Sequence, residues 1–586
     1  MRYLKIFVAL LLLFILLSAC LAAPIPDQGS TSSAPLSETS SRSILTYSDL
    51  ITGFNPLGIL GEAAVTIPED ATPSPHTFEG YLELLDESTN GEAEVYSGSF
   101  PEKYKHLPEF NFAFVKWKDY LIPVQRGLII SNASTYNFIL EPGRIWQESE
   151  DQSWSRASLP FSLVFKGNNS MLSGTLTFLF NGQTVSKAWY QITQEVTTNT
   201  KADLWGLLDA EYHAASLPNA DNVRQSFQAE LANRFPTQPI SDLAGLYPDI
   251  DLSAFGSGVP PQHMAWYGVI VDGVNYLGGC QTRAGTYPYC EWMRQPSYSV
   301  AKSTFPALAL MRLTQVFGAQ VPNLLIKDYL PEVVSGKGNW DTVTFNNALD
   351  MATGNYGSTG FMIDDNSDKM MEFFIAQPYA ARMQAALDWP ELAPPGTRWV
   401  YRTSDTFILT RAMQNYLRTQ TGGEDDIFQY VVDEIYAPLG LGPGAFTTMR
   451  SADDDWHGQA EGGYGLWWIP DDIAKLTTFL LLEQGQIGGE QILDPGLLAA
   501  SLQQDPADRG MSIGPVNTYN NAFWAQRFGP EQGYTCEFWV VEWQGISGNM
   551  VALFPNGIVY YYFSDSGEFT INQALSAANQ MHPFCP

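Results

Sequence analysis

Two different hydrophobic patterns distinguish residues 45–200 from residues 201–586. Residues 45–200 contain short segments that are rich in strand-forming residues, which is typical of β-structure. The clearest pair is 175–180 and 184–193, joined by Asn181-Gly182, a dipeptide suited to the positive φ angles of a hairpin turn. This first half is therefore predicted to be an all-β domain.

The second half, residues 201–586, mixes helical and extended patterns. Leucines at 204, 207 and 208, followed by Phe227 and Leu231, predict helices that lead into it. Apolar runs at 305–313 and 406–416 are helix-like. Segments 550–554 and 558–563, separated by a Pro-Asn-Gly turn, are strand-like. The pattern indicates a mixed α and β domain.

Composition narrows the range of partners. With 586 residues, of which 45% are hydrophobic, the chain can bury two sizeable cores. A net charge of -31 argues against nucleic acid or an anionic lipid surface as an electrostatic partner. Four tryptophans of the first half could line a glycan site, although dispersed tryptophans in a β-domain are more often core residues; they are Trp117, Trp146, Trp154 and Trp189.

The first twenty residues predict export. Arg2 and Lys5 precede an apolar run at 6–17 that is short for a membrane span and typical of a signal peptide. Residues 17–20, ending in Cys20, resemble a bacterial lipobox, so we expect cleavage before Cys20 and lipidation of its thiol; ordinary cleavage shortly after Cys20 is the alternative. Residues 21–44 are then a flexible tether. The expected location is the periplasmic or cell-surface side of a membrane, with the lipid as anchor.

The cysteine count agrees with export. If Cys20 carries the lipid, Cys280, Cys290, Cys536 and Cys585 form an even set that allows three disulfide pairings. The first two flank a segment suited to a hairpin loop, and a bond between the last two would fix the C-terminal tail. An exported chain favours disulfides, whereas reduced, buried thiols are the alternative.

The strongest chemical signal is Ser299-Val300-Ala301-Lys302 at the start of a predicted helix. Positions i and i+3 share a helix face, so the hydroxyl and the amine lie side by side. A serine becomes a nucleophile when a base takes its proton, and a partly buried lysine can be that base. The pattern suits acyl transfer, although such a pair also occurs on solvated helix faces. Pro306 predicts a bend in the helix because it removes the N–H partner of the Lys302 carbonyl.

Two further motifs follow in order along the chain. Residues 394–397, Pro-Pro-Gly-Thr, predict a turn into a short extended piece that carries Tyr401, Thr403 and Asp405. Residues 462–466, Gly-Gly-Tyr-Gly-Leu, are followed by Pro-Asp-Asp at 470–472 and form a further segment with a counterpart in the family named below.

Together these motifs resemble those of the serine β-lactamase and penicillin-binding-protein superfamily, in particular its class C β-lactamase and esterase branch. That family has a Ser-x-x-Lys helix, a Tyr-x-Asn element and a strand with Lys-Thr-Gly or His-x-Gly. The resemblance covers residues 225–586. It implies an α/β (α+β) β-lactamase/transpeptidase-like catalytic domain with an antiparallel sheet flanked by helices and a helical subdomain, behind the all-β domain.

The resemblance also implies a mechanism. Ser299 would be the nucleophile, with Lys302 and Tyr401 as the proton-transfer pair and the Ser299 N–H as one donor to the oxyanion. Water or another acceptor would release the acyl group, and no cofactor or metal is required.

Two positions depart from the family pattern. Thr403 stands where the family has asparagine, and Asp405 is a candidate substitute. The best candidate for the third motif is the segment 545–549, in which Ile546 replaces the family's Lys or His, Ser547 and Gly548 would meet the substrate, and the Asn549 N–H would be the second oxyanion donor. Without the cation, recognition of a substrate carboxylate is weakened, which favours an esterase or amidase.

Several alternatives stay open. A catalytically silent relative would bind a glycan or peptide in the same pocket or through the β-domain. A true β-lactamase or D-Ala-D-Ala peptidase would need an arginine from elsewhere. A Ser-His-Asp triad that uses His263 or His457 has no motif support, and Gly545-x-Ser547-Gly548 lacks the last glycine of a nucleophile elbow. We therefore expect an exported serine hydrolase acting on a small-molecule, peptide or glycan acyl substrate.

Overall fold

The computed structural model describes residues 45–53, 58–85, 91–198 and 200–585. The predicted signal peptide, the lipobox cysteine Cys20 and the whole predicted tether lie outside the described residues. From Leu45 onward these residues belong to one compact unit. None of the helices among them has the length and apolar character needed to cross a lipid bilayer.

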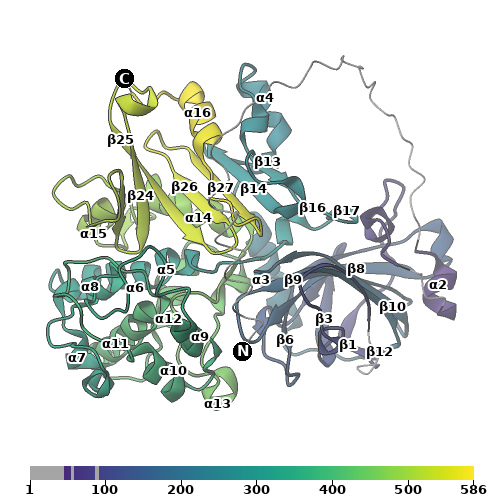
Figure 1. The fold of residues 1–586 in the computed structure, drawn as a ribbon. Coiled ribbons are helices and arrows are strands. Elements are labelled where there is room, and N and C mark those ends of the chain that lie inside the picture. Colours follow the sequence, from purple (N-terminus) through teal and green to yellow (C-terminus); the bar gives the residue numbers. More distant parts are fainter. Residues whose placement is uncertain (1–44, 54–57, 86–90, 199, 586) are drawn as a thin grey trace. The chain divides into compact units, whose positions relative to one another are not determined.

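The first half contains an antiparallel sheet of twelve strands, as its sequence pattern predicted (Figure 1). Strands β9 and β10 form the predicted hairpin, whose loop has Gly182 at a φ of 85°. The strands are β1 (Glu79–Leu84), β2 (Glu92–Ser97), β3 (Phe110–Trp117), β4 (Tyr120–Pro123), β5 (Gly127–Ile129), β6 (Tyr136–Leu140), β7 (Gly143–Trp146), β8 (Ser155–Phe165), β9 (Met171–Phe180), β10 (Val185–Val196), β11 (Lys201–Leu208) and β12 (Ala210–Ala214).

The sheet continues past residue 200, where helices were predicted. Leu204, Leu207 and Leu208 lie on strand β11, and the helix α3 (Ala220–Ala232) begins only after β12. Leu204 and Leu208 enter the core of the β-domain, whereas Leu207 packs against a second cluster on the other face. A strand that is covered on both faces loses its simple alternation, which is why the pattern was misleading.

The tryptophans of this half belong to the core rather than to a glycan-binding platform. Trp146 and Trp189 are fully buried. Trp154 packs against the same cluster as Trp189, and Trp117 packs against the main core.

The second half is built on a nine-stranded sheet in the order β13-β15-β14-β27-β26-β25-β24-β23-β22. All neighbours are antiparallel except β13 and β15. The strands are β13 (Thr237–Pro239), β14 (Met264–Val271), β15 (Val274–Gly279), β22 (Met511–Ser512), β23 (Asn517–Asn520), β24 (Phe523–Phe528), β25 (Phe538–Gly545), β26 (Asn549–Leu553) and β27 (Val559–Ser564). Short ribbons pair β16 (Gln281–Thr282) with β17 (Gly285–Thr286), β18 (Gln295–Pro296) with β19 (Trp467–Trp468), and β20 (Gln486–Ile487) with β21 (Glu490–Gln491).

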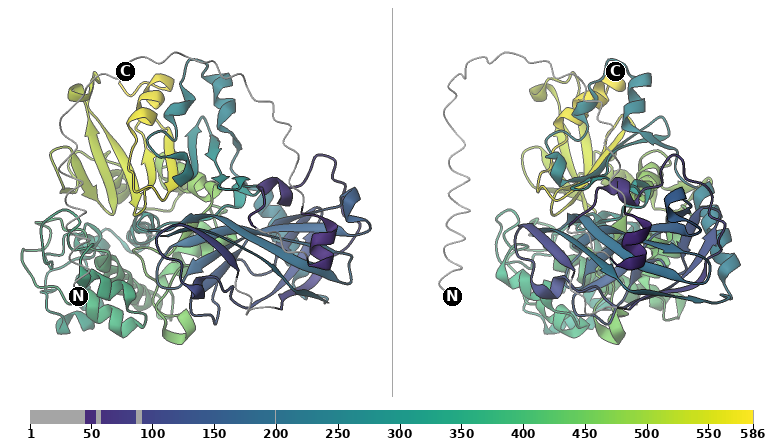
Figure 2. Two further views of the ribbon diagram at one scale, coloured as in Figure 1. Left: turned by 45° about the vertical axis from the view of Figure 1, so that its right-hand side comes forward. Right: turned by 90° about the vertical axis from the view of Figure 1, so that its right-hand side faces the viewer.

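Helices cover both faces of this sheet, in agreement with the expected architecture. Met550 and Ala552 of β26 pack with the C-terminal helix α16 (Asn572–Met581), which lies beside β27 in Figure 1 and can be followed in Figure 2. Val551, which points the other way, packs with residues of α6 (Pro306–Phe317) and α14 (Pro470–Leu481). Both faces are therefore core, and only the end of β25, residues 543–545, continues beyond its pairing with β24.

The remaining helices build the expected helical subdomain and a few connections. A short helix α5 (Val300–Thr304) precedes α6, and Phe305 between them has φ -124° and ψ -74°, so the bend predicted from Pro306 is confirmed. The other helices are α2 (Tyr47–Thr52), α4 (Leu243–Leu246), α7 (Ile326–Tyr329), α8 (Phe345–Leu349), α9 (Asp368–Ile375), α10 (Tyr379–Ala386), α11 (Thr403–Thr421), α12 (Ile427–Val431), α13 (Asp453–Trp456) and α15 (Pro495–Ser501).

Two disulfide bonds stabilise the second half. The disulfides are Cys280–Cys290 and Cys536–Cys585, the pairing that the sequence favoured. The first closes a loop before the nucleophile segment, and the second holds the C-terminal tail beside the start of β25.

A buried charge network joins the two halves. Arg126 and Glu141 of the β-domain form an ion pair, and Arg126 also contacts Glu230 on α3. Arg294, which precedes Ser299 by five residues, contacts Glu141 and lies 3.1 Å from the Asp472 carboxylate on α14. Because each charge has an opposite partner, the network can stay buried at the junction.

Candidate active site

Ser299 stands at the start of α5 and is the one partly exposed residue in an otherwise buried segment, 297–304. The preceding residue, Tyr298, has a φ of 42°, in the left-handed region, so the chain turns sharply into the helix. Among the described residues, no acceptor receives the Ser299 backbone N–H. The turn thus presents both the hydroxyl and a free N–H at one point.

Lys302 lies next to the Ser299 hydroxyl. Its Nζ is 2.9 Å from Ser299 Oγ, 3.1 Å from Thr403 Oγ1 and 3.0 Å from the Gly463 carbonyl oxygen. Burial lowers the pKa of Lys302 to about 8, although the nearby Asp365 carboxylate opposes this shift. A substantial neutral fraction of Lys302 is therefore available near neutral pH to accept the serine proton.

Tyr401 completes the group predicted from the motifs. Lys302 Nζ lies 5.0 Å from the centre of the Tyr401 ring. Burial raises the pKa of Tyr401, while hydrogen bonding with the Ser299 side chain opposes that rise. The ring stacks on Trp524, with centroids 5.6 Å apart and an interplanar angle of 27°. Tyr401 is thus held as a neutral phenol that can donate a proton beside the nucleophile.

Thr403 takes the place of the family's asparagine, and an aspartate that the sequence analysis missed supports it. Asp365 accepts hydrogen bonds from the Thr403 backbone N–H at 2.6 Å and from Thr403 Oγ1 at 3.2 Å. Desolvation raises the pKa of Asp365, and Lys302 opposes this effect. Asp365 comes from a loop before α9 without a motif, so only the three-dimensional fold brings it to the lysine.

Asp405, the candidate substitute for that asparagine, faces elsewhere. It forms a buried ion pair with Arg402, and Thr353 Oγ1 lies 3.4 Å from its Oδ2. Burial raises the pKa of Asp405 to about 6. The prediction that Asp405 contacts the substrate is corrected: it stabilises the start of α11.

The predicted third motif is displaced by three residues, from 546–548 to 543–545. Residues 546–548 form the turn between β25 and β26, with Ser547 at a φ of 74° and Ile546 half exposed. The strand position against the nucleophile segment belongs to Gly545, where a Cβ atom would lie 2.7 Å from the Ser297 carbonyl oxygen. The end of β25, Trp543-Gln544-Gly545, therefore occupies the place expected for the third motif. Ser547 and Gly548 shape its following turn.

The assignment of the second oxyanion donor changes with the position of the third motif. Asn549 pairs with Gly545 across the hairpin, and its side chain donates to the Pro296 carbonyl at 2.7 Å. Ile546 follows Gly545 directly, and its N–H has no acceptor among the described residues. Strand alternation directs this N–H away from β26, to the side of β25 where α5 packs. Ile546 thus replaces Asn549 as the candidate donor.

The histidine and elbow alternatives lack the required geometry. His263 Nδ1 lies 2.8 Å from Asp565 Oδ1, and that carboxylate also accepts from Lys201. His457 follows the end of α13. Ser547 lies in a strand–turn–strand hairpin and not in the strand–turn–helix of a nucleophile elbow. Among the residues whose positions are described, no group of His, Cys, Asp and Glu is arranged to hold a metal ion.

Comparisons with known proteins find a likeness only at the level of structure. No family model and no curated protein matches the chain. Solved structures similar to it include the hydrolase EstCE1, described as having promiscuous acyltransferase activity (14% identity, 61% of this chain and 98% of that chain, TM-score 0.40). A simvastatin synthase from Aspergillus terreus (15%, 58% and 95%, 0.40) and a class C β-lactamase (15%, 63% and 98%, 0.38) are further examples. At these identities and TM-scores the likeness by itself assigns no activity, so function is argued from the site.

Proposed function

We propose that this protein is a serine hydrolase that cleaves a carboxylic ester or amide through a covalent acyl-enzyme on Ser299. The observation that carries the proposal is the 2.9 Å contact between Ser299 Oγ and the buried Lys302 amine, whose pKa is lowered to about 8. A serine beside a buried, partly neutral base is an activated nucleophile.

The geometry supports the following sequence of steps. Lys302 takes the proton of Ser299 as Oγ attacks the substrate carbonyl. The N–H groups of Ser299 and Ile546 hold the resulting oxyanion. Tyr401 then donates a proton to the leaving alcohol or amine, and Lys302 reprotonates Tyr401 through their shared contact with Ser299. Water attacks the ester carbonyl in the second half of the reaction and releases the acid.

The environment of the third motif favours an ester or amide over a β-lactam. Where the family carries Lys or His, this chain has the fully buried Trp543. A carboxylate at this place would lack a charge-assisted hydrogen bond, which is worth about 1.5–3 kcal/mol. We therefore expect short neutral nitrophenyl esters to be turned over faster than a chromogenic cephalosporin.

Covalent labelling tests the proposal. The purified protein is incubated with a fluorophosphonate, and the modified peptide is identified by mass spectrometry. Wild type and Ser547→Ala should both be labelled on Ser299, whereas Ser299→Ala should be unlabelled and inactive with an unchanged circular-dichroism spectrum. Turnover by a folded Ser299→Ala protein would reject the assignment. A folded wild type that is neither labelled nor active would favour the silent binding protein.

We further propose that the chain is an exported lipoprotein held at a membrane through Cys20. The support is the leader sequence together with the even number of the other cysteines, which form two disulfides. Cys20→Ala should move the protein from the membrane fraction to the soluble fraction or leave its leader uncleaved. A soluble wild type with a mature N-terminus beyond Cys20 would contradict this proposal.

A further inference from the structure

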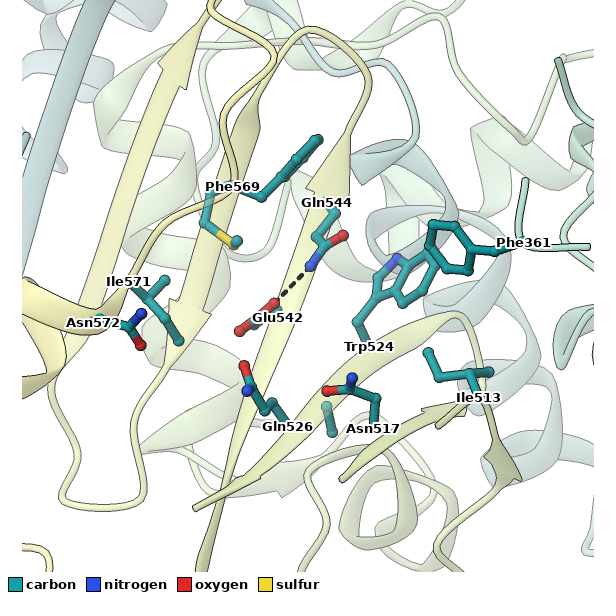
Figure 3. A pocket seen from close by; sticks show the side chains of 12 residues that line it. Phe361, Ile513, Asn517, Trp524, Gln526, Glu542, Gln544, Phe569, Ile571 and Asn572 are labelled. Carbon is teal, nitrogen blue, oxygen red and sulfur yellow. Dashed lines mark hydrogen bonds between the residues drawn. The ribbon is translucent and has the colours of Figure 1, made fainter. Parts of the chain in front are cut away.

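A cavity of about 270 Å³ lies on the nine-stranded sheet. Strands β24, β25 and β26 form its floor, and residues 569–572, which follow β27, form one wall (Figure 3). Its lining residues are Phe361, Ile513, Asn517, Trp524, Ala525, Gln526, Glu542, Gln544, Met550, Phe569, Ile571 and Asn572.

This cavity shares two walls with the candidate active site. Gln544 directly precedes Gly545, the residue that lies against the Ser297 carbonyl. On another side, Trp524 stacks on the ring of Tyr401. A substrate bound at Ser299 can therefore extend one of its ends into the cavity.

Glu542 lies at the centre of the floor and is the one ionisable group among the lining residues. Its side chain is 5% exposed, and Gln544 Nε2 donates to its Oε2 at 2.6 Å. Figure 3 shows the carboxyl group between Gln544 and Gln526. Among the described residues, no lysine or arginine forms an ion pair with Glu542. A buried carboxylate without a cation is costly, and a cationic ligand would remove much of that cost.

Aromatic rings stand around the same carboxyl group. Figure 3 shows Trp524 beside Glu542, Phe361 next to Trp524 on its far side, and Phe569 near Gln544. Ring faces attract ammonium groups, whereas a substrate carboxylate would meet repulsion from Glu542. The chain's net charge of -31 also draws cations toward the protein surface.

We propose that this cavity is a substrate subsite for an alkylammonium group, held by the Glu542 carboxylate and the rings of Trp524, Phe361 and Phe569. The inference rests on the proposed hydrolase function, because the cavity is connected to the candidate active site through Trp524 and Gln544. It names the substrate class: esters or amides that carry a positive charge on one side of the scissile bond.

The subsite should depend on pH. Burial raises the pKa of Glu542 to about 7, so the carboxyl loses its proton, and gains attraction for a cation, as the pH rises through about 7. Tyr562 on β27 and Glu568 in the next loop are the other titratable groups on this side, and burial raises the pKa of Tyr562 further above neutrality. The titration of Lys302 affects the rates with charged and neutral substrates equally. The ratio of kcat/KM for the charged ester to that for the neutral ester therefore reports the titration of Glu542 alone.

Two pairs of isosteric esters test the subsite. The first pair is acetylcholine and 3,3-dimethylbutyl acetate, which places the charge in the alcohol. The second is the nitrophenyl esters of 4-(trimethylammonio)butyrate and 5,5-dimethylhexanoate, which places it in the acyl group. For at least one pair, wild type should prefer the charged ester by about tenfold in kcat/KM, equivalent to about 1.4 kcal/mol, and the preference should grow between pH 6 and 8.

Matched variants identify the group responsible. Glu542→Gln keeps the size of the side chain and should lower the ratio to the small part that the rings contribute, with no change between pH 6 and 8. Phe569→Leu, on the exposed rim, should lower the ratio partially and serves as a second test if Glu542→Gln folds poorly. Glu568→Gln removes the same charge outside the cavity and should keep the wild-type ratio. A ratio near one in wild type, or a preserved ratio in folded Glu542→Gln, would overturn the subsite while leaving the hydrolase assignment intact.

Direct binding separates failure of the subsite from failure of the proposed function. If wild type hydrolyses none of the four esters and is not labelled by the fluorophosphonate, the hydrolase proposal fails. The subsite is then decided by calorimetric titration of Ser299→Ala with acetylcholine and with 3,3-dimethylbutyl acetate. Binding of the charged ester that is lost in Ser299→Ala/Glu542→Gln supports the subsite, whereas equal binding of both esters, or no binding, rejects it.

Discussion

The side chain of Asn169 accepts a hydrogen bond from the backbone N–H of Tyr298 at 2.8 Å. Asn169 lies at the tip of the β8–β9 hairpin in the β-domain, and Tyr298 is the residue before the nucleophile. The same Oδ1 atom is 3.1 Å from Ser297 Oγ and 3.0 Å from the Gly465 N–H. The buried side-chain amide of Asn169 thus stabilises both the turn before Ser299 and the loop whose Gly463 carbonyl accepts a hydrogen bond from Lys302.

Asn169→Ala should reduce kcat by about 10–100-fold and leave KM unchanged, because Asn169 positions Ser299 without touching the substrate, and a misplacement of about 1 Å can cost that much. Asn168→Ala, at the neighbouring exposed position, is the control and should behave as wild type. Steady-state kinetics beside thermal unfolding measure the effect. An increase in KM with kcat preserved would show that Asn169 has no positioning role.

The activity should rise with pH through about 8, because Lys302 must lose its proton before it can accept that of Ser299. Asp365→Asn should move the midpoint of kcat/KM to lower pH, since the Asp365 charge raises the pKa of Lys302. Asp368→Asn, an exposed change on α9, should leave the midpoint in place. A profile measured with a neutral ester checks this, and a midpoint that moves upward in Asp365→Asn would refute the assignment of Lys302 as base.

Tyr401→Phe should slow turnover by about 10²–10⁴-fold, the usual contribution of a positioned acid or base. The ring can keep its stacking on Trp524, so the melting temperature should change little. Tyr519→Phe is the control, because it removes the same hydroxyl group from the same aromatic cluster. The centroids of the Tyr519 and Tyr401 rings lie 6.2 Å apart. Similar losses in both variants would indicate a packing effect and not proton transfer.

Gly545→Ala should lower kcat by about 10²–10³-fold, the range for loss of one oxyanion donor. A Cβ atom would meet the Ser297 carbonyl at 2.7 Å and push the end of β25, with the Ile546 N–H, away from Ser299. Gly529→Ala, after β24, has its nearest neighbours at 3.8 Å and is the control. Full activity of Gly545→Ala, measured with a nitrophenyl ester, would place the third motif elsewhere.

The sequence predicted those parts of the site that are encoded by local pattern. Ser299 and Lys302 share one helix turn, so their contact follows from spacing alone. Tyr401 precedes a helix with clear periodicity, and the family order placed it near the nucleophile. The β9–β10 hairpin and the bend at Pro306 likewise depend on residues close in the chain.

The parts that depend on distant contacts were missed or shifted. Asp365 and Asn169 carry no motif, and they reach the site through loops whose paths only the packed fold defines. The third motif was placed by matching Ile546-Ser547-Gly548 to the family's third motif, but the deciding constraint is the steric contact between Gly545 and Ser297, which no local pattern reveals. Strand β11 was read as a helix because both of its faces are buried.

The charge network at the junction has a consequence for how the protein is made. Arg126, Glu141 and Asn169 leave the ribosome before Arg294 and Tyr298, so the β-domain can fold first and act as a template for the nucleophile turn. A gene shortened to begin after Ala214 would encode Arg294 without Glu141, and removing one partner of a buried ion pair costs about 3–5 kcal/mol. The second half is therefore not expected to function without the β-domain. A descendant of this gene that loses its N-terminal half would need new contacts to hold the turn before Ser299.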